Sequence, residues 1–390
     1  MNPSGIGWIK KLQKELLSNS AVLEDDEEVF YKALRESGFI YGSNLSVVAN
    51  LINKTGLTED ELCKLNLVIT LAYAHKHSES KQSFTKSVIE FYEAINELKT
   101  SFFQGLLGAR KTTEQLEKII HKRIQIDDNA LTKNFNYFII NALLFVDVLA
   151  YKSYLKHDGI SINYIKRLES VIESISLSVL NSKTSKSKYD EGLIKLFESS
   201  LRYKNHETID YNTAVSYAET NLEKYYIVDL ACMASWSDRV IDSAEQQFLQ
   251  QLGLDLSLTE LRIEDAIQTV NHFYTSNKDN IALLSSKNIV QSFYNNSSKM
   301  VTKLITRNRK RLYQELKDSK ELMVLLTQST VRDLNKEEQK KVQEQLLDIF
   351  KSIPSLAIFL LPGGMLLLPI VVKFIPKLLP SAFDENRLED

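Results

Sequence analysis

The chain has 390 residues, a mass of 44.7 kDa and a formal net charge of −2. Its 12 glycines and 6 prolines fall well below typical usage, which excludes collagen-like chains and most turn-rich β architectures. Hydrophobic residues make up 44% and charged residues 25%, so the chain can bury a core. The near-neutral charge gives no whole-protein attraction to nucleic acid or lipid, so any such attraction must be local.

Proline is absent between Ser4 and Ile353, and apolar residues recur at the three-to-four spacing of helices. We therefore predict an all-α, multi-domain protein, with boundaries near Lys204 and Gln291. The predicted parts are an N-terminal helical region over 1–204, a second helical domain over 205–290 and a C-terminal part over 291–390. Capping-box spacing predicts helix starts at Thr58–Glu61, Asp242–Glu245, Ser257–Glu260 and Asn335–Glu338.

The first predicted helix covers residues 8–17 (WIKKLQKELL) and is amphipathic. It either packs on the protein's own core or touches a membrane surface. Later in the chain, Cys63 and Cys232 belong to no CxxC or Cys/His cluster, so neither disulfides nor zinc are expected. No nucleophile–base set or phosphate loop is visible, and we expect a protein that is not an enzyme.

Residues 225–248 read YYIVDLACMASWSDRVIDSAEQQF. This stretch resembles the tellurite-resistance TerB-like helical domain, in which an apolar helix is followed by Ala-Asp-Gly and then by acidic residues that open the next helix. Asp238, Asp242 and Glu245 fall on that pattern, and Arg239 stands in place of the glycine. The resemblance covers residues 221–270 and implies a helical domain that in some relatives binds a divalent cation.

Two interpretations of the three carboxylates remain open. Asp238, Asp242 and Glu245 could bind a hard divalent cation through oxygen, which is the one cofactor that the sequence suggests. Asp229, on the preceding apolar helix, could then be a fourth ligand, although its position favours a residue at the boundary of the apolar face. Alternatively, Asp242 and Glu245 form a capping box and Asp238 caps or solvates the turn.

The next feature is a basic stretch upstream of an apolar tail. Between Lys299 and Lys351 there are 13 Lys/Arg and 8 Asp/Glu, with a cluster at Arg307, Arg309, Lys310 and Arg311. Residues 299–317 hold a single aromatic residue, so they offer no stacking platform for RNA, and no nucleic-acid partner is expected. We expect this cluster to face anionic lipid instead.

The tail from Pro354 to Val372 contains 19 residues and no charge. That length approaches the span of a bilayer, and the basic flank indicates a cytoplasmic start. We predict a membrane segment over 353–380 that is a kinked span, a re-entrant hairpin at Gly363-Gly364 or an element packed on its own protein. Its marker residues are Pro362, Gly363, Gly364, Pro369, Lys373, Pro376 and Pro380.

Residues 334–383 combine a capped basic helix (LNKEEQKKVQEQLLDIFKSIP) with LPGGMLLLPIVVKFIPKLLPSAF. In this order of prolines the stretch resembles the leucine zipper and EF-hand transmembrane (LETM) family. The resemblance implies a membrane protein of cation/proton exchange and organelle or envelope homeostasis, and some bacterial relatives are described as biofilm-associated. Met365 departs from the family, which usually has an acidic residue there.

These features lead to one interpretation with two alternatives. We expect a LETM-related adaptor or organiser at the cytoplasmic face of the inner (plasma) membrane, with most of the chain cytoplasmic. Its partners would be membrane lipid and a protein, or a second copy of the chain. The alternatives are a factor for cation/proton homeostasis or transport, and a TerB-like metal-binding module of the stress response.

Overall fold

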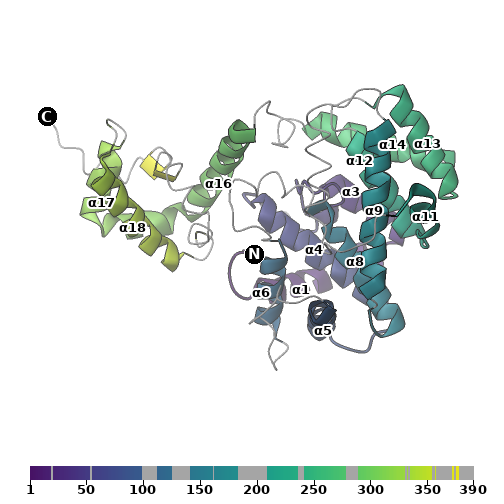
Figure 1. Cartoon of the computed structure of the whole chain (residues 1–390). Helices are drawn as coiled ribbons and strands as arrows, with labels where there is room; N and C mark the ends of the chain where they lie inside the picture. The colour runs from purple at the N-terminus through teal and green to yellow at the C-terminus, as the bar shows by residue number, and fades with distance from the viewer. Residues whose placement is uncertain are drawn as a thin grey trace.

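The computed structural model describes residues 1–18, 21–52, 55–98, 112–124, 141–160, 162–182, 209–235, 241–277, 289–329, 332, 334–353, 356, 371–372 and 375–376. Within these ranges the regular elements are all helices and no strand occurs, which confirms the all-α prediction. The helices form two parts, a large helical body from α1 to α14 and a smaller C-terminal unit built on α16, α17 and α18 (Figure 1).

The body comprises α1 (Trp8–Ser18), α2 (Ala21–Glu24), α3 (Glu27–Ser37), the 3-10 turn η1 (Val48–Asn50), α4 (Glu59–Lys76), α5 (Phe84–Leu98), α6 (Thr113–Ile124), α8 (Leu144–His157), α9 (Ile162–Ser182), α11 (Tyr211–Ser216), α12 (Asn221–Ser235), α13 (Ser243–Asp255) and α14 (Glu260–Asn277). The C-terminal unit comprises α16 (Ile289–Lys317), α17 (Lys320–Gln328) and α18 (Lys336–Ser352).

Local capping chemistry sets several helix starts. Complete capping boxes open α4 at Thr58, α13 at Asp242 and α18 at Asn335, as the sequence predicts. The predicted start at Ser257 is wrong. Thr259 takes that role, because its hydroxyl accepts from the Arg262 amide at 3.3 Å and α14 begins one residue later.

Two glycines are explained by close contacts. Gly38 ends α3 with φ +81°, and a Cβ there would lie 1.9 Å from the Ser43 carbonyl oxygen. Gly253 lies inside α13, near its end at Asp255. A Cβ at Gly253 would lie 2.3 Å from Ile263 Cγ1, so this glycine allows α13 and α14 to approach each other.

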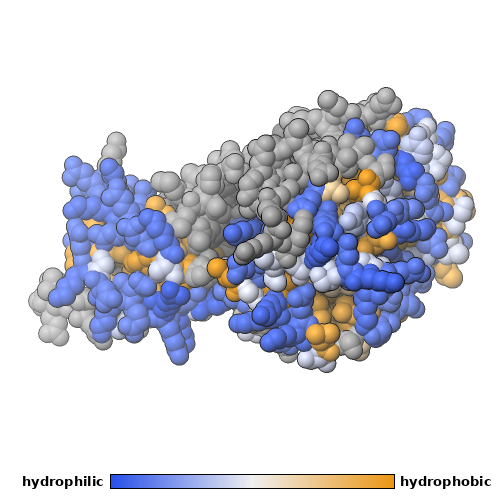
Figure 2. All heavy atoms as spheres, turned by 90° about the horizontal axis from the view of Figure 1, so that it is seen from below, coloured by the Kyte–Doolittle hydropathy of each residue, from blue (hydrophilic) through white to orange (hydrophobic). Residues whose placement is uncertain are grey.

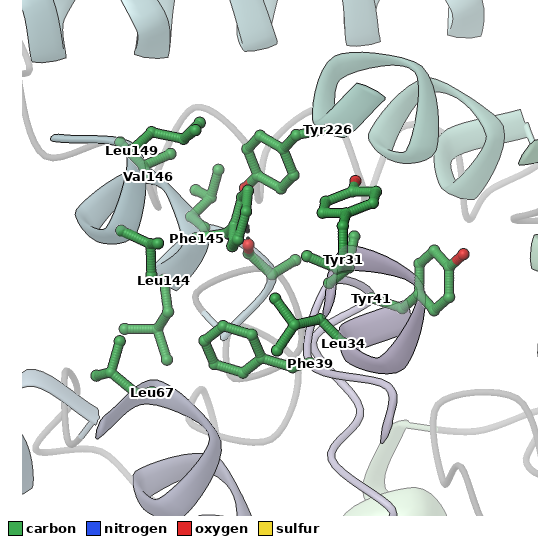
Figure 3. Packing of buried hydrophobic residues seen from close by; sticks show 14 of the residues in the cluster. Tyr31, Leu34, Phe39, Tyr41, Leu67, Leu144, Phe145, Val146, Leu149 and Tyr226 are labelled. Carbon is green, nitrogen blue, oxygen red and sulfur yellow. Dashed lines mark hydrogen bonds between the residues drawn. The ribbon is translucent and has the colours of Figure 1, made fainter. Parts of the chain in front are cut away.

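The core of the body is one continuous cluster of buried apolar residues from Trp8 to Tyr274. In Figure 3 the Phe145 ring lies beside Tyr226, with ring centroids 5.0 Å apart, and it also meets Tyr31 edge-on at 5.7 Å. These aromatic residues come from α3, α8 and α12, so helices on both sides of residue 204 share this core. The predicted boundary at that residue stays a prediction.

The N-terminal helix belongs to the same core. Trp8, Ile9, Leu12 and Leu16 of α1 are buried, and the lysines of α1 point outward. Buried Glu117 of α6 fixes the start of α1, because its carboxylate accepts from the amides of Gly7 and Ile9 at 2.9 Å each. Of the two interpretations of residues 8–17, the structure therefore agrees with the one in which this helix packs on the protein's own core.

The C-terminal unit has a separate buried cluster that runs from Val301 to Ile375. None of its members belongs to the cluster of the body. α16 runs through the predicted boundary at Gln291, so the helix itself extends from that position into the unit (Figure 1). The unit therefore has a small core of its own, made by α16, α17, α18 and part of the tail.

Candidate functional site

The basic face of α16 follows from its helical spacing. Its apolar positions, among them Val301, Ile305 and Leu312, are buried against the C-terminal unit. Helical geometry then turns the residues between them away from that core. The exposed basic residues on the described part of the helix include Lys303, Arg309, Lys310, Arg311 and Lys317.

Arg307 differs from the other three members of the predicted basic cluster. Its guanidinium makes two hydrogen bonds to the carboxylate of Glu61 in α4, one of them from Nη2 to Oε1 at 2.8 Å. The Arg307 side chain is 16% exposed and that of Glu61 is 1% exposed. Arg307 thus joins α16 to the body, whereas Arg309, Lys310 and Arg311 face solvent.

Glu61 lies at the centre of a small polar network. One carboxylate oxygen accepts from the Thr58 amide at 3.0 Å and the other from the Ser4 hydroxyl at 2.7 Å. Burial raises the pKa of Glu61, but the Arg307 side chain, the Thr58 amide and the Ser4 hydroxyl lower it more. The net pKa of this carboxyl lies below its ordinary value of 4.5, so Glu61 is ionised at neutral pH.

A second contact reinforces this junction. The Lys303 ammonium lies 3.4 Å from the carbonyl oxygen of Leu57, in the segment that leads into α4. Lys303 and Arg307 are four residues apart and so occupy the same face of α16. Lys303 and Arg307 therefore contact the body around the start of α4. The basic residues that follow them on α16 are exposed to solvent.

The predicted membrane segment is described only in part. Of its marker residues, Pro376 is described, and Pro362, Gly363, Gly364, Pro369, Lys373 and Pro380 lie outside the described residues. Val371 and Ile375 are fully buried in the core of the C-terminal unit. Across the parts of the chain that the structure describes, no helix combines the length and the apolar character that a bilayer crossing requires.

The C-terminal segment also carries the match to known proteins. Residues 334–390 match the family model described as LETM1-like, RBD. We call residues 334–390 the LETM1-like segment, after this similarity. No curated protein and no solved structure matches the chain.

The match supports the LETM resemblance and covers residues 334–390 of this chain. It does not support the TerB-like character of residues 205–290 or the biofilm-associated type, which stay predictions. The exposed basic cluster of α16 lies just before the LETM1-like segment, and α16 packs with α18 in one core.

Inside the LETM1-like segment, α18 is the described helix. Val342, Leu346 and Phe350 are buried, which places one apolar face of α18 against α16 and α17. Its outer face is charged, and hydrophilic residues cover most of the described surface of the C-terminal unit, with a narrow apolar band between them (Figure 2). Burial of Val371 and Ile375 agrees with the alternative in which this part of the tail packs on its own protein.

Two of the three carboxylates that the sequence suggests as metal ligands have a clear structural role. Asp242 Oδ1 accepts from the amides of Ala244 and Glu245 at 2.8 Å each, and Glu245 Oε2 accepts from the Asp242 amide at 2.9 Å. Asp238 lies outside the described residues. Within the described ranges no group of three or more His, Cys, Asp or Glu side chains could hold a metal ion.

Asp229 belongs to a buried network that the sequence does not predict. Its carboxylate lies 3.3 Å from Arg35 Nε and accepts from the Tyr31 hydroxyl at 2.7 Å. Arg35 also donates to the half-exposed carboxylate of Asp265 at 2.6 Å. Burial would lower the pKa of Arg35, but the Asp229 charge raises it above its ordinary value, so the guanidinium stays charged. This network connects α3, α12 and α14.

Proposed function

We propose that this chain is a non-enzymatic, LETM-related protein that associates with a membrane and acts as an adaptor or organiser at its cytoplasmic face. The observation that carries the proposal is the LETM1-like match over residues 334–390. The exposed cations of the neighbouring helix support it, because Lys and Arg near an anionic leaflet contribute about 1 kcal/mol each to attraction.

In this proposal the body and the C-terminal unit have different tasks. The C-terminal unit contacts the inner (plasma) membrane through the basic face of α16 and through residues 353–380. The body, with its separate core, presents a helical surface to a protein partner or to a second copy of the chain. The basic flank before the apolar tail supports the cytoplasmic side for the bulk of the chain.

Cation/proton transport, which the family resemblance implies, is the less favoured function. No Asp or Glu occurs between Pro354 and Val372, and an ionisable residue within a membrane segment is the usual carrier of a proton or cation. Reconstituted chain in vesicles is therefore expected to give no more cation flux than empty vesicles.

The test of the proposal is flotation of the full chain with vesicles. We expect tighter binding to vesicles of equal amounts of phosphatidylglycerol and phosphatidylcholine than to vesicles of phosphatidylcholine alone. Replacing Arg309, Lys310 and Arg311 by Glu should weaken binding to the anionic vesicles by about 100-fold or more, since the loss of three attractive charges alone gives that factor and the new charges are repulsive. Added salt should weaken binding of the unmodified chain because it screens exposed charges.

A matched control separates this effect from a general change of charge. Lys10, Lys11 and Lys14 are exposed on α1, and replacing them by Glu alters the net charge by the same amount. This variant should bind anionic vesicles like the unmodified chain. Equal binding of both triple variants would contradict the assignment of the α16 cluster to the membrane surface.

A further inference from the structure

The body and the C-terminal unit are joined through polar contacts. Among the residues that the structure describes, their two buried apolar clusters have no residue in common. The described side-chain hydrogen bonds between them run from Arg307 to Glu61 and from Lys303 to the Leu57 carbonyl. We call the Arg307–Glu61 ion pair the junction pair. A contact of this kind can open without exposing an apolar core.

Arg307 also lies within the basic face of α16. Lys303, Lys310 and Arg311 are four residues before, three after and four after it, which are the positions of nearest neighbours on a helix. All three neighbours are exposed. A negatively charged surface that approaches this face therefore meets Arg307 as well, provided that Arg307 is not already held by Glu61.

The Glu61 carboxylate and a phosphate on an approaching surface are equivalent acceptors for Arg307. A guanidinium binds a carboxylate or a phosphate with the same pair of parallel N–H donors. Glu61 would not be left without partners if Arg307 moved away, because the Thr58 amide and the Ser4 hydroxyl still donate to its two oxygens. Opening of the junction pair therefore costs less free energy than it would if Arg307 were the single partner of the buried Glu61 carboxylate.

Resting on the membrane association proposed above, we propose that the phosphates of an anionic lipid surface compete with Glu61 for Arg307, so that binding to the membrane detaches the C-terminal unit from the start of α4. The junction pair then holds the basic face back in the absence of membrane. The apparent dissociation constant for anionic lipid is then the intrinsic one divided by the fraction of molecules in which Arg307 is not paired with Glu61.

The test measures binding of the full chain to vesicles of equal amounts of phosphatidylglycerol and phosphatidylcholine. Arg307→Lys keeps the positive charge for lipid but cannot make the two-pronged contact with Glu61. Glu61→Gln removes the competing charge and keeps a side-chain oxygen for the capping box at Thr58. Both variants should bind the vesicles about 5-fold or more tightly than the unmodified chain.

Two controls accompany these variants. Glu27→Gln breaks the surface ion pair with Lys152 in the body and changes the net charge by the same amount as Glu61→Gln, and it should leave vesicle binding unchanged. The second control is the double variant Arg307→Gln with Glu61→Gln. It should bind the vesicles as tightly as Arg307→Gln alone, because the junction pair is already absent in that single variant. Unchanged helical circular dichroism at the assay temperature shows that each variant is folded.

The outcomes separate this inference from the proposed function. If the unmodified chain binds the anionic vesicles and both Arg307→Lys and Glu61→Gln bind no more tightly, the competition is overturned and membrane association stands. If the unmodified chain does not bind anionic vesicles at all, membrane association through this face fails and the competition fails with it. Tighter binding of both variants, with Glu27→Gln unchanged, supports the competition.

Discussion

At the scale of single residues, the buried charge of Asp229 depends on its cation. Arg35 and Asp229 are both almost fully buried, and Tyr31 donates to the same carboxylate. Burial and the Asp229 charge raise the pKa of Tyr31 well above its ordinary value of 10.0, so this hydroxyl remains a donor at neutral pH. Burial raises the pKa of Asp229 above its ordinary value, and the Arg35 charge and the Tyr31 hydrogen bond oppose that rise, so these two partners favour the charged carboxylate.

Arg35→Met should therefore lower the free energy of unfolding by about 3–5 kcal/mol, because it leaves the buried Asp229 carboxylate without its cation. Denaturation in urea, followed by circular dichroism, measures the change. Asp265→Asn is the matched control, since it removes the half-exposed partner of the same arginine and should lower this free energy by about 1 kcal/mol or less. Similar losses in the two variants would argue against a buried pair.

At the scale of elements, the start of α13 decides between capping and metal binding. The described geometry commits Asp242 and Glu245 to each other's backbone amides, which is what a capping box requires. Asn and Asp are equally good N-cap residues, but a neutral amide is a weaker ligand for a divalent cation than a carboxylate. The two substitutions at this position therefore give different results under the two interpretations.

If capping is the role of Asp242, Asp242→Asn should keep the melting temperature of the unmodified chain, and Asp242→Ala should lower the free energy of unfolding by about 0.5–2 kcal/mol. Addition of magnesium or calcium should then leave the melting temperature of all three proteins unchanged. A rise with either ion in the unmodified chain, lost in Asp242→Asn, would restore the metal site, because an ion that binds only the folded state stabilises it.

At the scale of the whole molecule, local chemistry was predictable from the sequence and distant pairing was not. The capping boxes at Thr58, Asp242 and Asn335 involve residues three apart, so their spacing alone predicts them. The predicted helix start at Ser257 is wrong because Ser257 adopts a left-handed φ of +56° and Thr259, two residues later, caps the helix instead. Capping spacing does not distinguish between such neighbours.

The candidate site was predictable only in part, for the same reason. The basic cluster of α16 and the LETM1-like segment are each a single short stretch of sequence, and both can be recognised there. The partner of Arg307 lies 246 residues away, and the Tyr31–Asp229 hydrogen bond joins residues 198 apart. Such contacts depend on how the helices pack, and helical periodicity shows which face is buried but not against which other helix.

Attachment to the membrane through the C-terminal segment is the central claim, and fractionation of cells tests it most directly. The experiment compares the full chain with a version that stops after Ser352, each followed by an alkaline carbonate wash of the membranes. We predict that the full chain stays in the washed membranes and that the wash removes the shortened chain, which keeps the basic face of α16 and lacks residues 353–390. Release of the full chain by the same wash would contradict the claim.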